Sequence, residues 1–246
     1  MNAPCGSPSV GEVVRNYDED QYALPIIIRL EKDTTTYRQD ALVATMTAVA
    51  LLLLARASNQ EWDRVITLWM NDDKHRKIAR KARGARWEAV SELPGVEVTY
   101  RTATVRVLVP HLLVETPVEV SRLQVAGIDL EPRSSAFTVR VLIPRPLVGT
   151  AAKVARLHVA INPDVPMSTG KQMAQVGHAI HYASLYPEQF SKAFDAQRST
   201  LDVDIVDWAD APSDGSVINV EDAGYTEVPP GTVTVKAWFS SADEVA

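Results

Sequence analysis

The chain has 246 residues, of which 46% are hydrophobic and 23% charged, a composition typical of a soluble protein with one large or two small domains. Its formal net charge of −6 is not the overall basic balance expected of a nucleic-acid-binding protein. The single cysteine, Cys5, excludes an internal disulfide and a thiolate metal site, and we therefore expect a cytoplasmic protein.

The beginning of the chain shows no targeting signal. Residues 1–20 contain proline, glycine, serine and acidic residues instead of a basic start followed by an apolar stretch, so we predict a mobile leader there. The longest apolar run, Ala41–Ala55, is interrupted by threonines and is too short to span a bilayer. We expect no association with a membrane.

The elements of the first half follow from apolar periodicity. Leu24–Leu30 is a short β-branched run that predicts a buried strand. Apolar positions three and four residues apart then predict one helix from about Gln39 to Arg56 and a second from Asn59. A third helix is expected over the basic stretch and as far as Pro94-Gly95, followed by one or two strands in Val96–Val109.

The basic stretch is the one strong concentration of positive charge. Seven cations fall within thirteen residues: Lys74, Arg76, Lys77, Arg80, Lys81, Arg83 and Arg86. Such a patch attracts phosphates even on an acidic protein, and a solvated helix face explains it equally well.

A short sequence repeat lies near the middle of the chain. Thr104–Pro110 returns as Thr138–Pro144, and Val120–Ala126 returns at the same offset as Val154–Ala160. The repeat predicts two similar strand-turn-strand pieces, which we interpret as a duplicated connector between the two halves.

The second half repeats the order of the first. We expect a strand at Leu157–Ile161, a helix from Gly170 to about Tyr186 and another from Pro187, and then strands at Leu201–Val206, Val217–Val220 and Gly231–Phe239. This order predicts an α/β fold with a small mixed β-sheet flanked by helices. Because both halves share it, we expect two related units, 21–134 and 135–246, fused as a pseudo-dimer.

The predicted helix of the second half carries the first group of chemically useful residues. Lys171, Gln175 and His178 are spaced to share one helix face, whereas His181 is expected to be exposed. A cation in the first turn of a helix is disfavoured by the helix dipole, so Lys171 indicates an anionic ligand at the helix start. The alternative interpretation is a polar surface stripe.

The second group lies in a turn between two predicted strands. Asp222 ends a strand, Ala223-Gly224 permits a tight turn, and Thr226 follows. A carboxylate and a hydroxyl placed in this way can orient a water molecule and accept its proton. The alternative is that Asp222 only satisfies backbone N–H groups within the turn.

Together the two segments resemble the type 2 peptidyl-tRNA hydrolase family. Met167, Gly170, Lys171, Ala174, Gln175, His178 and Ala179 fall in the register of the family's first motif, and Asp222–Thr232 resembles its second. The resemblance covers about Arg156 to Phe239. Thr169 stands where the family has a lysine, which puts activity in doubt, and the first half lacks both motifs.

The resemblance implies hydrolysis of the ester bond of peptidyl-tRNA at one site in the second half. It implies Lys171, Asp222 and Thr226 as catalytic residues, and Gly170, Gln175 and His178 as substrate-binding residues. The tRNA also requires positive charge, for which Lys77, Arg80 and Lys81 of the basic stretch are the candidates. No histidine has metal-site spacing to a carboxylate, so we expect neither metal nor cofactor.

Three other functions stay open on the sequence. The first is an inactive tRNA- or RNA-binding module that keeps the fold, the second a scaffold protein, and the third a hydrolase acting on another ester or amide. The partner is expected to be peptidyl-tRNA. The chain is expected to be a monomer with internal two-fold pairing, with a homodimer as the alternative.

Overall fold

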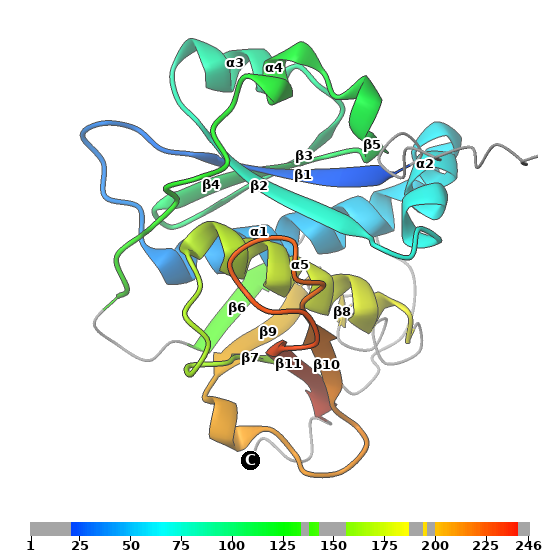
Figure 1. The fold of residues 1–246 in the computed structure, drawn as a ribbon, viewed down its shortest axis with the longest axis vertical. Helices are drawn as coiled ribbons and strands as arrows, with labels where there is room; N and C mark the ends of the chain where they lie inside the picture. The colour runs from blue at the N-terminus through cyan, green and yellow to red at the C-terminus, as the bar shows by residue number, and fades with distance from the viewer. Residues whose placement is uncertain (1–20, 134–137, 143–155, 187–193, 196–199, 241–246) are drawn as a thin grey trace, which may run out of the picture.

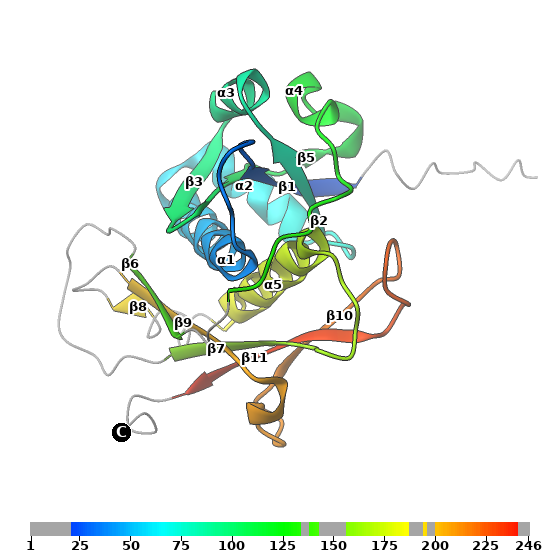
Figure 2. The same cartoon turned by 90° about the vertical axis from the view of Figure 1, so that its left-hand side faces the viewer.

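A computed structural model describes residues 21–133, 138–142, 156–186, 194–195 and 200–240. Within these ranges the protein is a mixed α/β structure with two mixed β-sheets and five α-helices. Figures 1 and 2 show the layers: the long helices α1 (Arg38–Ala55) and α5 (Thr169–Ser184) lie between the two sheets, and short helices cover the outer face of the first. The predicted leader lies outside the described residues.

The first sheet has the strand order β2-β1-β4-β3. Its strands are β1 (Tyr22–Arg29), β2 (Arg76–Ala82), β3 (Gly95–Tyr100) and β4 (Ala103–Leu108), and the two-residue β5 (His111–Leu112) extends the pairing of β1. β1 runs parallel to β2 and antiparallel to β4. Its apolar run is buried because helices cover both faces of the sheet, as the sequence predicts for this strand.

Helix α1 is buried on nearly all sides. Thirteen of its eighteen residues are buried, and a helix that is apolar all round belongs in a protein interior. With the 3₁₀ turn Arg56–Ser58 it is also long and apolar enough to cross a membrane, but its apolar surface packs between the sheets. The expected bounds of about 39–56 agree with the structure.

The basic stretch does not form the expected helix. The second helix, α2 (Gln60–Met70), begins as predicted, with the Asn59 side chain accepting a hydrogen bond from Trp62 N at 3.1 Å. The cations that follow lie mainly on strand β2, and only then does α3 (Ala85–Ser91) begin. The helix prediction is therefore correct for the part around Trp87 and Val90, which is α3, and wrong for the basic residues before it, because pairing with β1 determines the conformation of that segment.

The second sheet has the order β10-β11-β7-β9-β6, and β8 (Phe194–Asp195) also pairs with β9. Its other strands are β6 (Thr138–Leu142), β7 (Arg156–Ile161), β9 (Thr200–Val206), β10 (Ile218–Glu221) and β11 (Val233–Ser240), and a 3₁₀ turn lies at Trp208–Asp210. The strands and α5 agree with the sequence expectations to within about two residues. The helix expected from Pro187 falls outside the described residues.

The two sheets share one topology. Numbered within each half, the four main strands of both sheets follow the order 2-1-4-3: β2-β1-β4-β3 in the first and β9-β7-β11-β10 in the second. In both, the first two strands are parallel, and the last two form a hairpin that runs antiparallel to the first. Each long helix follows the first strand of its own half.

The sequence repeat does not follow this shared topology. Both copies of the first repeated segment contain a strand, which is β4 in the first half and β6 in the second. However, β6 pairs with β9 at the edge of the second sheet, and the first sheet has no strand at the equivalent position. Val120–Ala126 is not a strand, since it contains the end of α4 (Val118–Ser121) and the start of the linker. The expectation of two similar strand-turn-strand pieces was therefore wrong in its second element. In that element, Val120 and Leu123 pack instead into a small core under α3.

A linker crosses the starts of both long helices. After the 3₁₀ turn Leu113–Glu115 and α4, the chain runs along 123–133. Ile128 O accepts a hydrogen bond from Gly170 N at 3.1 Å, and Glu131 O accepts one from Arg38 N at 2.9 Å. One buried cluster contains residues of both halves, so the two sheets and both helices share a core.

Candidate active site

A cavity of about 680 Å³ lies where the two halves meet. Its walls are β2 from the first half, and α5 with the β10–β11 turn from the second. Both sequence motifs contribute to it. Of the nine residues expected to be catalytic or substrate-binding, eight line it: Lys77, Arg80, Gly170, Lys171, Gln175, His178, Asp222 and Thr226.

Lys171 and Asp222 form an ion pair at the centre of the site. Lys171 Nζ contacts Asp222 Oδ2 and also donates to Thr226 Oγ1 at 2.9 Å. The side chain of Asp222 is only 3% exposed and that of Lys171 12%. The three residues expected to be catalytic are therefore in direct contact, although they come from a helix and from a distant turn.

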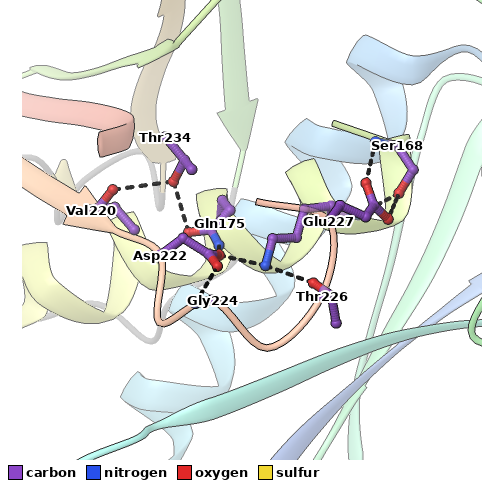
Figure 3. A network of polar contacts seen from close by, with 9 residues as sticks. Ser168, Gln175, Val220, Asp222, Gly224, Thr226, Glu227 and Thr234 are labelled. Atoms are coloured by element: carbon purple, nitrogen blue, oxygen red, sulfur yellow. Dashed lines mark hydrogen bonds and ion pairs between the residues drawn. The ribbon is translucent and has the colours of Figure 1, made fainter. Parts of the chain in front are cut away.

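Two further side chains hold the Asp222 carboxylate in place, as Figure 3 shows. Gln175 Nε2 donates to Asp222 Oδ2 at 2.5 Å, and Thr234 Oγ1 donates to Gln175 Oε1 at 2.9 Å. The carboxylate of Asp222 only accepts hydrogen bonds, so the Gln175 amide presents its nitrogen to it and its oxygen to the Thr234 hydroxyl. Gln175 thus positions Asp222.

The turn around Asp222 is closely constrained. Asp222 Oδ1 accepts a hydrogen bond from Gly224 N at 2.8 Å, so the structural interpretation of this aspartate also holds in part. Gly224 has φ of +80°, and a Cβ there would lie 2.7 Å from Pro230, so only glycine fits. The Ala-Gly pair therefore holds the carboxylate against α5.

The start of α5 has protein acceptors for its amides. Ser168 caps the helix by accepting from Lys171 N at 3.2 Å, and Glu227 accepts from Ser168 N and Oγ at 2.8 and 2.6 Å. Together with the Gly170–Ile128 bond, these contacts occupy the amides expected to bind an anion. Glu227 is thus the anion at this helix start.

The Thr169 side chain contacts the linker and does not line the cavity. It is 3% exposed, and its Oγ1 accepts a hydrogen bond from Leu130 N at 3.0 Å. Gly170 lies directly under the linker, where a Cβ would come within 3.2 Å of Ile128. The position at which the resembling family has a lysine is thus buried in this chain.

The three basic residues expected to bind substrate have different environments. Lys77 is buried, with Nζ 3.0 Å from His178 Nδ1 and 4.5 Å from the Trp69 ring centroid. Arg80 donates to Leu123 O at 3.0 Å, and Lys81 donates to Gly127 O at 2.8 Å and does not line the cavity. Two of them thus hold the linker. Burial lowers the pKa of Lys77 well below its usual value, which weakens it as a phosphate-binding cation.

A buried histidine cluster lies behind Lys77. His181, expected at the surface, is fully buried 4.7 Å from the Trp69 ring and 4.9 Å from the His75 ring, measured between centroids. Burial lowers the pKa of His181 to about 2. Burial and then the nearby Lys77 lower the pKa of His178 well below its usual value. The histidines are therefore neutral near pH 7, and His178 serves as part of the cavity floor.

Sequence reasoning missed an aromatic residue at the cavity rim. Tyr225 is 52% exposed, and the Arg76 guanidinium lies 4.5 Å and the Lys74 ammonium 5.6 Å from its ring centroid. These contacts join the β10–β11 turn to the first half. Thr234 and Glu227 were also missed. The sequence did not single out Thr234, because Lys236 also lies between two apolar residues in β11 and only the structure shows that Thr234 is the buried one.

No group of three or more histidine, cysteine or acidic side chains able to hold a metal ion occurs in the part of the chain that the structure describes. Comparisons of the chain with models of known protein families, with curated proteins and with solved structures returned no match.

Proposed function

We propose that the protein hydrolyses the ester bond of peptidyl-tRNA and releases peptide and free tRNA. The observation that supports this most is the contact between Lys171 and Asp222 inside a cavity, since the two motifs of the family resemblance meet there. A surface stripe and an unrelated turn would have no reason to meet. The cavity volume is within the range of about 300–1,000 Å³ common for small-molecule sites.

Asp222 is the group that activates water in this proposal. Oδ2 accepts from both Lys171 and Gln175, whereas Oδ1 accepts from Gly224 N, which leaves Oδ1 a second lone pair for a water proton. As the water oxygen attacks the ester carbonyl carbon, its proton passes to Asp222. The bond between the carbonyl carbon and the ribose oxygen then breaks, and the ribose oxygen takes up the proton held by Asp222, which restores the carboxylate.

Lys171 and Thr226 stabilise the oxyanion that develops on the carbonyl oxygen. Lys171 donates to Asp222 and Thr226, so its ammonium retains a third N–H. Because Thr226 accepts from Lys171, its own hydroxyl proton is available to donate. Two donors aimed at a developing negative charge in a largely buried site are an effective form of catalysis.

The RNA end of the substrate would lie against the rim. An exposed tyrosine flanked by cations is the combination that stacks an unpaired base and attracts its phosphate. Tyr225, Arg76 and Lys74 provide it beside the catalytic turn. We assign the terminal nucleotide to this position, in place of Lys77 and Lys81.

The first half is, in this proposal, a fused and degenerate copy of the catalytic unit. The shared 2-1-4-3 strand order and the packing of α1 against α5 support an internal pseudo-dimer. The copy supplies one wall of the cavity through β2. This explains why one chain keeps two sheets but only one set of catalytic motifs.

The decisive experiment measures release of free tRNA from N-acetyl-aminoacyl-tRNA by the purified protein. Multiple turnovers are expected, and the Asp222→Asn protein prepared in the same way controls for contaminating hydrolases. Tight tRNA binding without turnover would instead support the inactive RNA-binding module. Neither binding nor turnover would indicate the scaffold.

A further inference from the structure

The open edge of the first sheet lies beside the catalytic residues. β2 pairs with β1 on one side and is the edge strand of its sheet. Five successive residues, Arg76–Arg80, all line the cavity. The face of a strand contributes alternate residues, so an unbroken run indicates that the cavity follows the edge of the strand.

The hydrogen-bonding groups of β2 can be assigned to their sides. Leu30 N donates to Ala82 O at 2.9 Å, which places the backbone groups of the even-numbered residues on the side of β1. Lys81 N donates to Gln124 O at 3.0 Å, which places those of the odd-numbered residues on the outer side. The N–H and C=O groups of Lys77 and Ala79 therefore face away from β1.

These four groups have no hydrogen-bond partner among the described residues. Unpaired backbone groups at a strand edge are a ready template for another chain in extended conformation. One residue of this edge is already paired within the protein, because Lys81 forms an isolated antiparallel bridge with Gln124. The unused part of the edge, Lys77–Ala79, is the part inside the cavity.

We infer that this edge binds the peptide part of the substrate as an added strand, with the residues next to the ester paired to Lys77 and Ala79. The inference rests on the proposed ester hydrolysis. An extended peptide matches a row of alternating donors and acceptors, whereas a ribose-phosphate chain has no matching row of amide donors. Asp222 and Lys171 line the same cavity and receive the ester.

In this mode of binding, the protein forms hydrogen bonds with the backbone of the peptide and not with its side chains. The enzyme would accept peptides of any sequence, provided that the last two residues carry ordinary amide bonds. Substrates with only one residue and a small blocking group would bind more weakly. The edge thus predicts a preference for peptide length over peptide sequence.

The first test uses acetyl-Ala-Ala joined by an amide to 3′-amino-3′-deoxyadenosine, which has no ester to cleave. Hydrogen exchange of single backbone amides is measured by NMR with and without this compound. Slowing of at least about tenfold is expected for Lys77 and Ala79, and no change for Ile78, whose amide faces β1. Absence of binding, or binding without slower exchange at both amides, would overturn the inference.

The second test changes the backbone groups themselves. Ala79→Pro removes one outward N–H, a change that edge strands tolerate, and should weaken binding of the compound about tenfold, whereas Ala79→Ser keeps the N–H and should not. Replacing the Ala-Ala amide of the compound by an ester should weaken its binding to the unaltered protein by a similar factor. Equal affinity of the amide and ester forms would contradict the added strand.

The two proposals fail in different ways. If N-acetyl-aminoacyl-tRNA is hydrolysed but the amides of Lys77 and Ala79 stay unprotected, the function stands and the peptide lies elsewhere. If the amides are protected but no ester is cleaved, the edge binds peptide and the catalytic proposal fails.

Discussion

In each half of the molecule, the first turn of the long helix meets the turn of the last hairpin, but the two meeting points differ in character. In the second half, Lys171 of α5 pairs with Asp222 beside an open cavity. In the first half, Asp40 of α1 is 1% exposed and accepts hydrogen bonds from Thr102 N and Oγ1 at 3.2 and 2.6 Å. Arg133 completes that contact, at 3.0 and 2.5 Å from Asp40.

Under the proposed function, the same arrangement serves stability in the first half and chemistry in the second. An aspartate in the first helical turn suits the helix dipole, and a lysine there opposes it. Burial raises the pKa of Asp40, but the hydrogen bonds from Arg133 and Thr102 outweigh burial and lower it. The two-residue β3–β4 turn contacts its helix through Thr102, whereas the longer β10–β11 turn lines an open cavity.

The largest expected effect is on catalysis in the second half. Asp222→Asn keeps the shape of the side chain but removes the base, and should lower the rate of N-acetyl-aminoacyl-tRNA hydrolysis about 10³-fold. Single-turnover rates and a thermal melt of the same sample measure rate and folding together. A rate within tenfold of the unaltered enzyme would remove Asp222 from the mechanism.

The matching change in the first half should affect stability. Asp40→Asn leaves Arg133 without its carboxylate and should cost about 1.5–3 kcal/mol of unfolding free energy, the usual contribution of hydrogen bonds to a charged group. Urea unfolding measures this loss. Hydrolysis per folded molecule should not change. A loss of activity comparable to that of Asp222→Asn would contradict the distinction between the halves.

The packing between the two halves around His181 should make the protein less stable at acid pH. His181 meets His75, Lys77, Trp69 and Tyr182 there, and its pKa is about 2 in the folded protein. The unfolded chain takes up this proton near pH 6.5 and the folded protein does not, so stability falls as pH drops below about 6.5. The loss is at most about 1.4 kcal/mol per pH unit for this group.

His181→Leu removes one titrating group of this cluster and should reduce the slope of stability against pH below pH 6.5, while His75 and His178, whose pKa values burial also lowers, retain their contributions. Urea unfolding at pH 8.5, 7.5, 6 and 5 gives the slope for both proteins. Between pH 7.5 and 8.5 the two slopes should agree, which controls for the change in packing. Equal slopes below pH 6.5 would show that the cluster does not control acid stability.

The smallest expected effect is on the affinity for tRNA, and its measurement shows which cations contact the RNA. Lys74→Glu with Arg76→Glu, at the rim, should weaken tRNA binding about tenfold and reduce its salt dependence. Arg83→Glu with Arg86→Glu changes the net charge equally, at exposed positions that do not line the cavity, and should change the affinity less than twofold. Equal effects of both pairs would indicate attraction by overall charge.

Much of the second half could be predicted because its motifs fix local geometry. Asp222-Ala-Gly224 requires a tight turn, and Lys171 and Gln175 must share a helix face, so their meeting follows once the helix packs on the sheet. The expected helix over the basic segment failed for a long-range reason. Pairing of β2 with β1 overrides local preference, and no local pattern shows it.

Burial of polar side chains was the other source of error. Lys77 and His181 are of types that usually lie at the surface, and both are buried where the two halves meet. Thr169, which stands where the resembling family has a lysine, is buried as well, and its hydroxyl accepts a hydrogen bond from the linker. Contacts between distant parts of the chain decide all three positions, so periodicity within one helix or strand does not reveal them.

The linker at 123–133 has a consequence for how the molecule behaves in dilute solution. It fastens the starts of α1 and α5 within one chain, through Ile128 and Leu130 on one side and Glu131 and Arg133 on the other. Two separate copies sharing a cavity would come apart on dilution, because their association depends on concentration. Joined partners meet at a fixed effective concentration, so the cavity between these halves persists at any protein concentration.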